Sequence, residues 1–300
     1  MSDDTPHPSS RSGPTAHGHG HHHPHAQGES HGHGNAGHSH AHTHGHAHNH
    51  DQWSGEEYLK RPGVQETAVI SHDSVVHALT GAGLSLDQLK HLDLLEVGCG
   101  AGAVTAHLVR TFGTVHSIDT SLSMLQTFST HLPSDPHNLT WALHGITPAS
   151  PAAFASGEPM LSPSATSPEG EHRKVSPPRA QFDVAIANLV VHHVDDLPSF
   201  FTGLLGLVKT GGWIVITEFG LEEGAEDPRL SVPLKEGKKD EHGSVNSAGH
   251  FHPAFTVASI TELFTKYGLV DVHAEIRGRL PVFEDKDKYP LNLIARGRKP

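Results

Sequence analysis

Three closely spaced glycines, Gly98, Gly100 and Gly102, form the part of this sequence that is best suited to hold a ligand. Glycine has no side chain, so a turn built from it can bend sharply and bring its backbone close to a bound molecule. Asp119 follows Gly98 by 21 residues. A carboxylate at that distance can accept hydrogen bonds from both hydroxyls of a ribose. The glycine turn and the carboxylate together predict a nucleoside-binding site.

Bringing these residues together requires one strand that leads into the turn and a parallel strand that ends at Asp119. Apolar runs predict both strands, at 92–97 and at about 114–119. Each strand is followed by an expected helix, and Ser121 is expected to cap the second helix. Ligands bind at the carboxyl ends of parallel strands, where both features lie. The alternation predicts an α/β fold with helices on both faces of the sheet. It continues with strands expected at about 139–144, 182–188, 213–217, 270–276 and 291–295 and helices at about 64–79, 197–208 and 257–267.

The glycine spacing alone does not choose the cofactor. Gly98, Gly100 and Ala103 also satisfy the G-x-G-x-x-G/A pattern of dinucleotide-binding dehydrogenases. An NAD(P)-dependent oxidoreductase is therefore one alternative. The features that separate the two interpretations are Glu96 before the first glycine, the third glycine at Gly102, and the motifs that follow.

Five motifs occur in a fixed order along the chain: Glu-Val-Gly-Cys-Gly-Ala-Gly at 96–102, Asp119, Phe-Asp-Val-Ala-Ile-Ala-Asn at 182–188, Val-His-His-Val-Asp at 191–195 and Leu-Val-Lys-Thr-Gly-Gly-Trp-Ile-Val-Ile at 207–216. With them the chain resembles the class I S-adenosylmethionine-dependent methyltransferases, in particular the small-molecule and lipid-like branch. The resemblance spans about residues 91–219 and, more loosely, 250–297. The family usually has proline where Thr210 stands.

The resemblance implies a Rossmann-like, doubly wound seven-stranded sheet with strand order 3-2-1-4-5-7-6, the last strand antiparallel, and S-adenosylmethionine as cofactor. The glycines and Asp119 would hold its methionine and ribose parts. Family members place an acidic residue after the third strand for the adenine amino group, and His144 occupies that region here. The cofactor-binding residues that we expect on this basis are Glu96, Gly98, Cys99, Gly100, Gly102, Asp119, Thr120, Met124, His144 and Asn188.

His192 and His193 are the candidate catalytic residues. A sulfonium methyl group is intrinsically electrophilic, so the protein mainly has to align the acceptor with it. A general base is needed only when the acceptor loses a proton, and imidazole suits that role at neutral pH. In phosphobase methyltransferases a histidine matching His193 is catalytic, so we favour His193. The alternative is that the pair only hydrogen-bonds the end of the strand.

The acceptor is expected to be a small molecule. Lys plus Arg number 21 and Asp plus Glu 33, and a net charge of −12 argues against nucleic acid as the partner. Asn188 is followed by Leu-Val-Val rather than the Pro-Pro-Tyr typical of nucleic-acid amino-methyltransferases. We read no apolar stretch as long as a membrane span, and the single cysteine, Cys99, fits a reducing compartment. We expect a cytoplasmic protein, with the nucleus as the alternative.

Residues 1–52 form a histidine-rich segment that we expect to be disordered, followed by a methyltransferase domain at 53–300. Of the 31 histidines, 16 lie within residues 1–50, which contain no Leu, Ile, Val, Phe, Tyr or Trp. Within the domain, residues 147–181 hold seven prolines and six serines and are expected to be a disordered insertion. A charged stretch at 221–252 is the candidate lid loop.

The histidine-rich segment predicts weak, multivalent binding of Ni²⁺, Zn²⁺ or Cu²⁺. It contains no cysteine, which argues against a defined tetrahedral site. This supports a rival hypothesis, a metal-binding or metal-storage protein whose methyltransferase-like domain is secondary or inactive. No metal site is expected in the folded domain. The tail histidines expected to contribute include His21, His22, His23, His40, His42 and His44.

Overall fold

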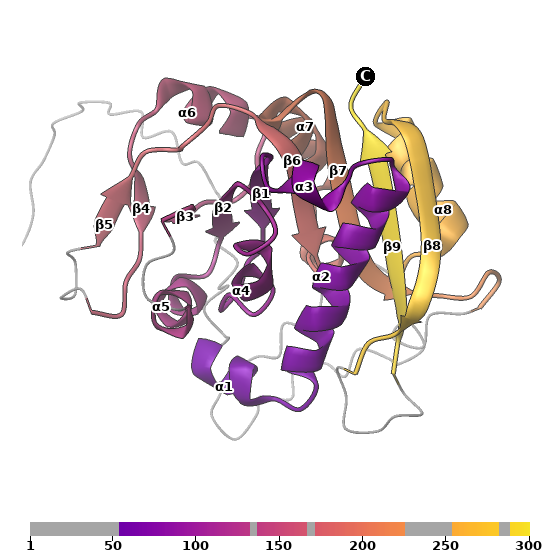
Figure 1. The fold of residues 1–300 in the computed structure, drawn as a ribbon, viewed down its shortest axis with the longest axis horizontal. Helices are drawn as coiled ribbons and strands as arrows, with labels where there is room; N and C mark the ends of the chain where they lie inside the picture. Colours follow the sequence, from indigo (N-terminus) through magenta and orange to yellow (C-terminus); the bar gives the residue numbers. More distant parts are fainter. Residues whose placement is uncertain (1–53, 133–136, 167–171, 226–253, 282–288) are drawn as a thin grey trace, which may run out of the picture. The chain divides into compact units, whose positions relative to one another are not determined.

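The computed structural model describes residues 54–132, 137–166, 172–225, 254–281 and 289–300. Seven strands form one mixed sheet in the order β3-β2-β1-β6-β7-β9-β8 (Figure 1). These strands are β1 (Asp93–Val97), β2 (Thr114–Asp119), β3 (Leu139–Leu143), β6 (Phe182–Asn188), β7 (Val208–Gly220), β8 (Val270–Arg279) and β9 (Leu291–Arg298). A separate hairpin pairs β4 (Met160–Ser162) with β5 (Arg173–Val175).

The strand order is the predicted one, and its labels differ only because the β4–β5 hairpin is counted in the chain. β1 lies in the middle of the sheet, parallel to β2 on one side and to β6 on the other. β9 is antiparallel to both of its neighbours, β7 and β8. The Rossmann-like fold class with an antiparallel last strand is therefore confirmed.

Helices cover both faces of this sheet (Figure 1). On one face pack residues of α2, α3, α4 and α5, and on the other those of α6, α7 and α8. The helices are α1 (Gly55–Lys60), α2 (Val64–Gly81), α3 (Leu86–Leu89), α4 (Thr105–Leu108), α5 (Leu122–His131), α6 (Ser150–Ser156), α7 (Leu197–Leu207) and α8 (Val257–Lys266). The 3-10 turn η2 spans Val191–His193.

The central strands alternate their side chains between the two layers of core. In β6, Val184 and Ile186 belong to the same buried core as residues of α2 and α4, whereas Ala185 and Ala187 belong to the core that contains residues of α7. All four are buried, as expected for a parallel strand covered on both faces. The sheet is thereby held rigidly from both sides, and the carboxyl ends of β1, β2 and β6 meet at one edge.

Asp183, at the start of β6, ties the opposite edge of the sheet together. Its carboxylate accepts a hydrogen bond from the backbone N–H of Asp93 at 2.9 Å and pairs with Lys209 Nζ at 2.8 Å. The interpretation of Asp183 as a structural residue therefore holds. It does not belong to the edge that carries the glycine turn.

The prediction that residues 147–181 are a disordered insertion is wrong for the residues described there, which form α6, β4 and β5. Phe154 of α6 is 2% exposed and packs edge-on against His116 and Phe182, with ring centroids 5.7 and 6.0 Å away. Pro151 stands in the first turn of α6, where proline is compatible with a helix. One buried aromatic side chain thus anchors a segment whose composition suggested a linker.

Two other expectations fall mostly outside the described residues. They are the disordered segment at 1–52 and the candidate lid at 221–252, of which only 221–225 are described. Within the described part of the chain, no helix combines the length and apolar character needed to cross a bilayer.

Candidate functional site

All three glycines of the turn after β1 adopt positive φ angles, 72° at Gly98, 53° at Gly100 and 87° at Gly102. Side chains are rarely tolerated in this left-handed region, which explains the choice of residue. The turn is also packed closely on two sides. A Cβ added at Gly98 would lie 2.2 Å from Val190 Cγ2, and one at Gly102 would lie 2.9 Å from the Phe128 ring.

Gly100 differs from its neighbours because its backbone faces open space. Among the residues that the structure describes, none has a heavy atom within 4 Å of a Cβ built there. The middle of the turn therefore presents bare backbone with room beside it, whereas both ends are packed into the protein.

The carboxylate of Asp119 binds this turn directly. Its Oδ2 accepts a hydrogen bond from the Gly100 N–H at 2.7 Å, and its Oδ1 accepts one from the Ser121 N–H at 2.8 Å. Each oxygen of a carboxylate can accept more than one hydrogen bond. The two features that predicted a nucleoside site are therefore in contact, at the adjoining ends of β1 and β2.

Glu96 lies beneath the turn and is only 2% exposed. The hydroxyls of Thr105 and Ser117 both donate to its Oε2 at 2.6 Å. Burial raises the pKa of Glu96 to about 7, and the nearby Asp119 charge acts in the same direction. Its carboxyl is therefore close to half ionised near neutral pH, and a cation placed beside it would favour the ionised form.

Three further residues expected at the cofactor site, Cys99, Thr120 and Met124, lie in the glycine turn, directly after β2 and in the first turn of α5. Burial, together with the charges of Asp119 and Glu96, raises the pKa of the Cys99 thiol, which stays protonated. Thr120 is exposed and lies against Gly145, since a Cβ added at Gly145 would be 3.0 Å from Thr120 Cγ2. Met124 is buried, and its N–H donates to Ser121 Oγ at 3.2 Å, so the predicted helix cap is confirmed.

His144 has its backbone beside Asp119 but its ring in the α6 region. The His144 N–H donates to the Asp119 carbonyl at 2.9 Å. The ring Nε2 is 2.8 Å from Ser150 Oγ, and the ring packs edge-on against Phe154. Burial lowers the pKa of His144, so the ring is neutral near pH 7. Residues of α6 therefore position the His144 ring, a contact that the sequence did not predict.

Asn188 ends β6 and is bonded to the neighbouring strand β7, where the Thr217 hydroxyl donates to its Oδ1. The next residue, Leu189, has a φ of 53°, and its N–H donates to the Thr217 carbonyl at 2.9 Å. A non-glycine residue in this left-handed region is strained, and such residues cluster at functional sites. The chain therefore turns abruptly as it leaves β6 and enters η2.

The two candidate catalytic histidines have different surroundings. His192 is 4% exposed, whereas His193 is exposed, and their ring centroids are 4.0 Å apart. His192 Nδ1 lies 2.8 Å from Glu218 Oε2, and the His192 N–H donates to Glu218 Oε1 at 3.2 Å. His192 therefore has a buried carboxylate, Glu218, as its partner.

Sequence reasoning missed Glu218, Thr105 and Ser117. The spacing of Thr105 and Ser117 in the sequence does not predict their contact with Glu96. They lie on α4 and β2, and their hydroxyls reach Glu96 only in the folded sheet. Glu218 did carry one, since it interrupts the apolar run of β7. An acidic residue in a strand expected to be buried requires a partner, and that requirement points to a polar site.

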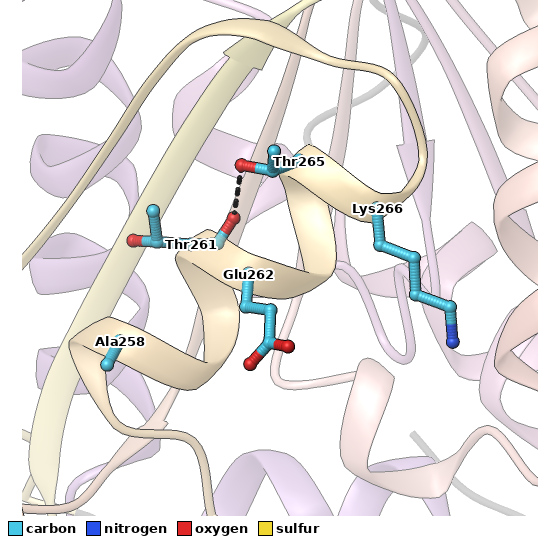
Figure 2. Close-up of a pocket in the computed structure, with 5 residues that line it drawn as sticks. All are labelled: Ala258, Thr261, Glu262, Thr265 and Lys266. Atoms are coloured by element: carbon cyan, nitrogen blue, oxygen red, sulfur yellow. Dashed lines mark hydrogen bonds between the residues drawn. The ribbon is translucent and has the colours of Figure 1, made fainter.

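Neither a metal-binding cluster nor the depression on α8 forms part of this site. Among the residues that the structure describes, no group of three or more His, Cys, Asp or Glu side chains is arranged to hold a metal ion. A shallow depression occurs on α8, where one helix alone provides the lining residues (Figure 2). None of these residues adjoins the glycine turn in sequence; they are Ala258, Thr261, Glu262, Thr265 and Lys266.

The fold and this edge of the sheet define a class of protein, the doubly wound α/β proteins with a glycine turn after β1, an acidic residue at the end of β2 and an antiparallel last strand. The sequence profile of the family described as "Methyltransferase domain" matches residues 71–274. The chain belongs to this family.

Known relatives match part of the chain. An uncharacterized methyltransferase of Mycobacterium tuberculosis is 24% identical over 152 residues, 51% of this chain and 59% of that protein. A malonyl-[acyl-carrier protein] O-methyltransferase of Magnetococcus marinus is 27% identical over 131 residues, 43% of this chain and 38% of that protein. The chain therefore spans less than two thirds of the length of either relative.

Among solved structures, phosphoethanolamine N-methyltransferase 2 of Haemonchus contortus, in complex with phosphomonomethylethanolamine and S-adenosylhomocysteine, is similar to this chain. The match has a TM-score of 0.47 and 18% sequence identity, and it covers 75% of this chain and 52% of that protein.

Proposed function

We propose that this protein transfers a methyl group from S-adenosylmethionine to a small-molecule acceptor. Membership of the methyltransferase family supports the reaction type. The observation that carries the proposal is the hydrogen bond between Asp119 Oδ2 and the Gly100 N–H, 2.7 Å long. It joins the carboxylate that we expect to bind the ribose to a turn whose backbone has no described heavy atom beside it at Gly100.

The residues present fit the chemistry of this cofactor. Asp119 offers acceptor atoms for ribose hydroxyls, and the open backbone at Gly100 leaves room that any side chain would reduce. Glu96 is a buried acid whose ionised form a cation would favour, so it suits the ammonium group of the methionine part. We assign Gly98, Cys99, Gly102, Thr120, Met124, His144 and Asn188 to the surroundings of the cofactor.

S-Adenosylmethionine supplies an electrophilic methyl group when it is bound. The protein's own contribution is to hold the acceptor in line and to exclude water, and positioning of this kind can provide about 7–11 kcal/mol of the barrier. The rigid, doubly covered sheet ends of β1, β2 and β6 are well suited to that task. A histidine at the end of β6 is required only for acceptors that lose a proton.

A small-molecule acceptor is favoured by charge and sequence. The net charge of −12 opposes binding to a phosphate backbone. The residues after Asn188 lack the Pro-Pro-Tyr sequence of nucleic-acid amino-methyltransferases. We also propose a reducing compartment, the cytoplasm, because the sequence contains a single cysteine.

Isothermal titration calorimetry of the full chain with S-adenosylhomocysteine and with NAD tests this proposal. We expect binding of S-adenosylhomocysteine and a loss of at least tenfold in affinity for Asp119→Ala. The matched control is Asp87→Ala, an exposed aspartate on α3, which should bind like the wild type. Binding of NAD without S-adenosylhomocysteine would refute the proposal in favour of an oxidoreductase.

We propose, as a second function, weak binding of divalent transition-metal ions by residues 1–50, because 16 histidines fall in this segment. Removing residues 1–50 should abolish most Ni²⁺ uptake and leave the affinity for S-adenosylhomocysteine unchanged. Equilibrium dialysis with Ni²⁺ measures the first and calorimetry the second. Unchanged Ni²⁺ uptake would show that the metal binds elsewhere.

A further inference from the structure

Ser176 is an exposed serine that directly follows β5. The residue before it, Val175, packs against the hydrophobic core and pairs across the hairpin with Met160, which packs there too. Successive side chains of an extended chain point to opposite sides. The anchoring of Val175 therefore turns the Ser176 side chain away from the core and toward solvent.

Two prolines, Pro177 and Pro178, come directly after Ser176. A residue that precedes proline is restricted to extended backbone, and this restriction applies to both Ser176 and Pro177. Pro177 has no N–H, so it cannot extend the hydrogen bonding of β5. The serine thus lies on a stiff, extended stretch of chain, which a modifying enzyme can bind on both sides without unfolding it.

Cationic side chains flank this serine on both sides. Arg173 and Lys174 precede it and are exposed, and Arg179 follows three positions later with half of its side chain exposed. The Arg179 guanidinium donates from Nε to Asp93 Oδ2 at 3.1 Å and from Nη1 to the Pro178 carbonyl at 2.8 Å. In a chain with a net charge of −12, this local excess of positive charge complements an enzyme with acidic groups beside its peptide groove.

Four other hydroxyl residues between 147 and 181 are also followed by proline, and the structure distinguishes them from Ser176. Ser150 and Ser162 are buried, with 0% and 3% of their surface exposed, so the folded protein withholds their hydroxyls from an enzyme. Thr147 is exposed, but its hydroxyl accepts a hydrogen bond from the Ala149 N–H at 3.3 Å in the turn before α6.

The fourth of these residues, Ser167, lies outside the described residues, but the sequence separates it from Ser176 as well. Ser176 is followed three positions later by an arginine, whereas none of the other four has Lys or Arg at that position. Accessibility and charge therefore select the same serine.

We propose that Ser176 is a phosphorylation site for a protein kinase that requires proline directly after the serine and recognises the basic residue at Arg179. The Ser176 hydroxyl oxygen forms a bond to the γ-phosphorus of ATP held by the kinase. The bond between this phosphorus and the oxygen that bridges it to the β-phosphate breaks, and ADP leaves with the electron pair. The hydroxyl proton passes to the catalytic aspartate of the kinase. The inference is independent of the proposed methyl transfer.

The phosphate would act on the ion pair between Arg179 and Asp93. A phosphoserine carries a charge of about −1.5 to −2 at pH 7 and accepts strong hydrogen bonds from a guanidinium. The phosphate and the Asp93 carboxylate would then compete for Arg179. Asp93 begins β1, whereas the glycine turn follows the other end of this strand, so the modification changes the sheet at the edge remote from the turn.

Phosphorylation of the full chain by a purified cyclin-dependent kinase, with ATP labelled on the γ-phosphate and the sites mapped by mass spectrometry, tests the site. We expect label on Ser176 and at least tenfold less label in Ser176→Ala. The matched control is Ser156→Ala, which changes an exposed serine that no proline follows and should be labelled like the wild type. Label on Thr147 or Ser167 with Ser176 unmodified, or an unlabelled wild type, would overturn the proposal.

The two prolines separate recognition of the sequence from simple exposure. Pro177→Ala should lower the rate of labelling at Ser176 at least tenfold, whereas Pro178→Ala should leave it within about twofold. Arg179→Gln should lower the rate about tenfold, because it removes the charge that the kinase recognises. Far-ultraviolet circular dichroism verifies that each variant is folded. Equal rates for Pro177→Ala and the wild type would refute a kinase of this class.

Phosphorus NMR of the phosphorylated chain tests the pairing of the phosphate with Arg179. A guanidinium beside the phosphate lowers its second pKa, so the wild type should titrate at lower pH than Arg179→Gln. Asp93 keeps Lys209 and Thr114 as partners in this variant. Lys266→Gln, which removes an exposed cation on α8, should titrate like the wild type. Identical titrations of the wild type and Arg179→Gln would contradict the competition with Asp93.

Discussion

The side chain of Val190 occupies the space into which a side chain at Gly98 would project, with Val190 Cγ2 only 2.2 Å from the position of an added Cβ. This contact joins the segment after β6 to the turn after β1. It has a direct consequence for packing, because nothing larger than glycine fits at Gly98 unless Val190 moves. The glycine turn and the histidine-bearing η2 are therefore mechanically connected.

Gly98→Ala should be strongly destabilising. The positive φ of 72° costs a side chain about 1–2 kcal/mol, and overpacking against Val190 adds about 1–3 kcal/mol. Urea denaturation should show a loss of about 2–5 kcal/mol in the free energy of unfolding. The matched control is Gly157→Ala, which has a similar φ of 68°. No heavy atom of the described part of the chain lies within 4 Å of a Cβ added there, so only the first cost applies. Equal losses for the two variants would mean that the Val190 contact is unimportant.

Gly100→Ala should separate binding from stability. A Cβ at Gly100 meets no atom of the described residues within 4 Å, so the free energy of unfolding should fall only by the cost of a positive φ, about 1–2 kcal/mol. The added methyl group enters the space proposed for the cofactor, so the affinity for S-adenosylhomocysteine should fall at least tenfold. Denaturation and calorimetry on the same preparation measure both quantities. Wild-type affinity in this variant would place the ligand elsewhere.

Cofactor binding should release a proton from Glu96. Burial raises the pKa of this carboxyl to about 7, so at pH 6.5 most molecules carry the proton, and a bound ammonium group would favour its loss. Calorimetry with S-adenosylhomocysteine at pH 6.5, in two buffers of different ionisation enthalpy, should give different heats for the wild type and equal heats for Glu96→Gln. Glu66→Gln, on the first turn of α2, should behave like the wild type. Equal heats for the wild type would contradict this role of Glu96.

His116 should make the protein sensitive to acid. Burial lowers the pKa of His116 from 6.5 to about 3, so between these values the unfolded chain binds a proton that the folded protein excludes. The free energy of unfolding should therefore fall as the pH falls, by about 1.4 kcal/mol per pH unit. The raised pKa of Glu96 acts in the opposite direction between pH 7 and 4.5, so the effect is clearest below pH 4.5.

Urea denaturation of the wild type and of His116→Leu at several pH values between 3 and 4.5 measures this contribution. The variant should lose less stability on acidification, by about 1.4 kcal/mol per pH unit. His91→Leu changes an exposed histidine and should retain the wild-type slope. Parallel slopes for wild type and His116→Leu would show that the buried histidine is not responsible.

The strands and the glycine turn were predictable from the sequence because their signals are local. β2 and β6 begin and end where the apolar runs predicted, and Ser121 caps α5 as expected. Gly100 and Asp119 meet because consecutive strands of a βαβ unit lie side by side, so a spacing of 21 residues was sufficient.

Features that depend on distant partners were not predictable in this way. The pairing of Glu218 with His192 arises only when β7 lies against β6, and the tie between His144 and Ser150 exists because α6 folds over the end of β3. β7 begins at Val208, earlier than the expected 213, because Gly211 takes a φ of 80° and lets the strand continue across the Gly-Gly pair. The high proline and serine content of residues 147–181 likewise gave no indication that Phe154 is buried.

The most direct test of the central claim is a crystal structure of the protein with S-adenosylhomocysteine. We predict that the ribose hydroxyls lie within hydrogen-bonding distance of the Asp119 carboxylate and that the ligand covers the backbone at Gly100. A ligand bound away from these two residues, or density that leaves the Asp119 carboxylate bonded to protein groups alone, would contradict the account.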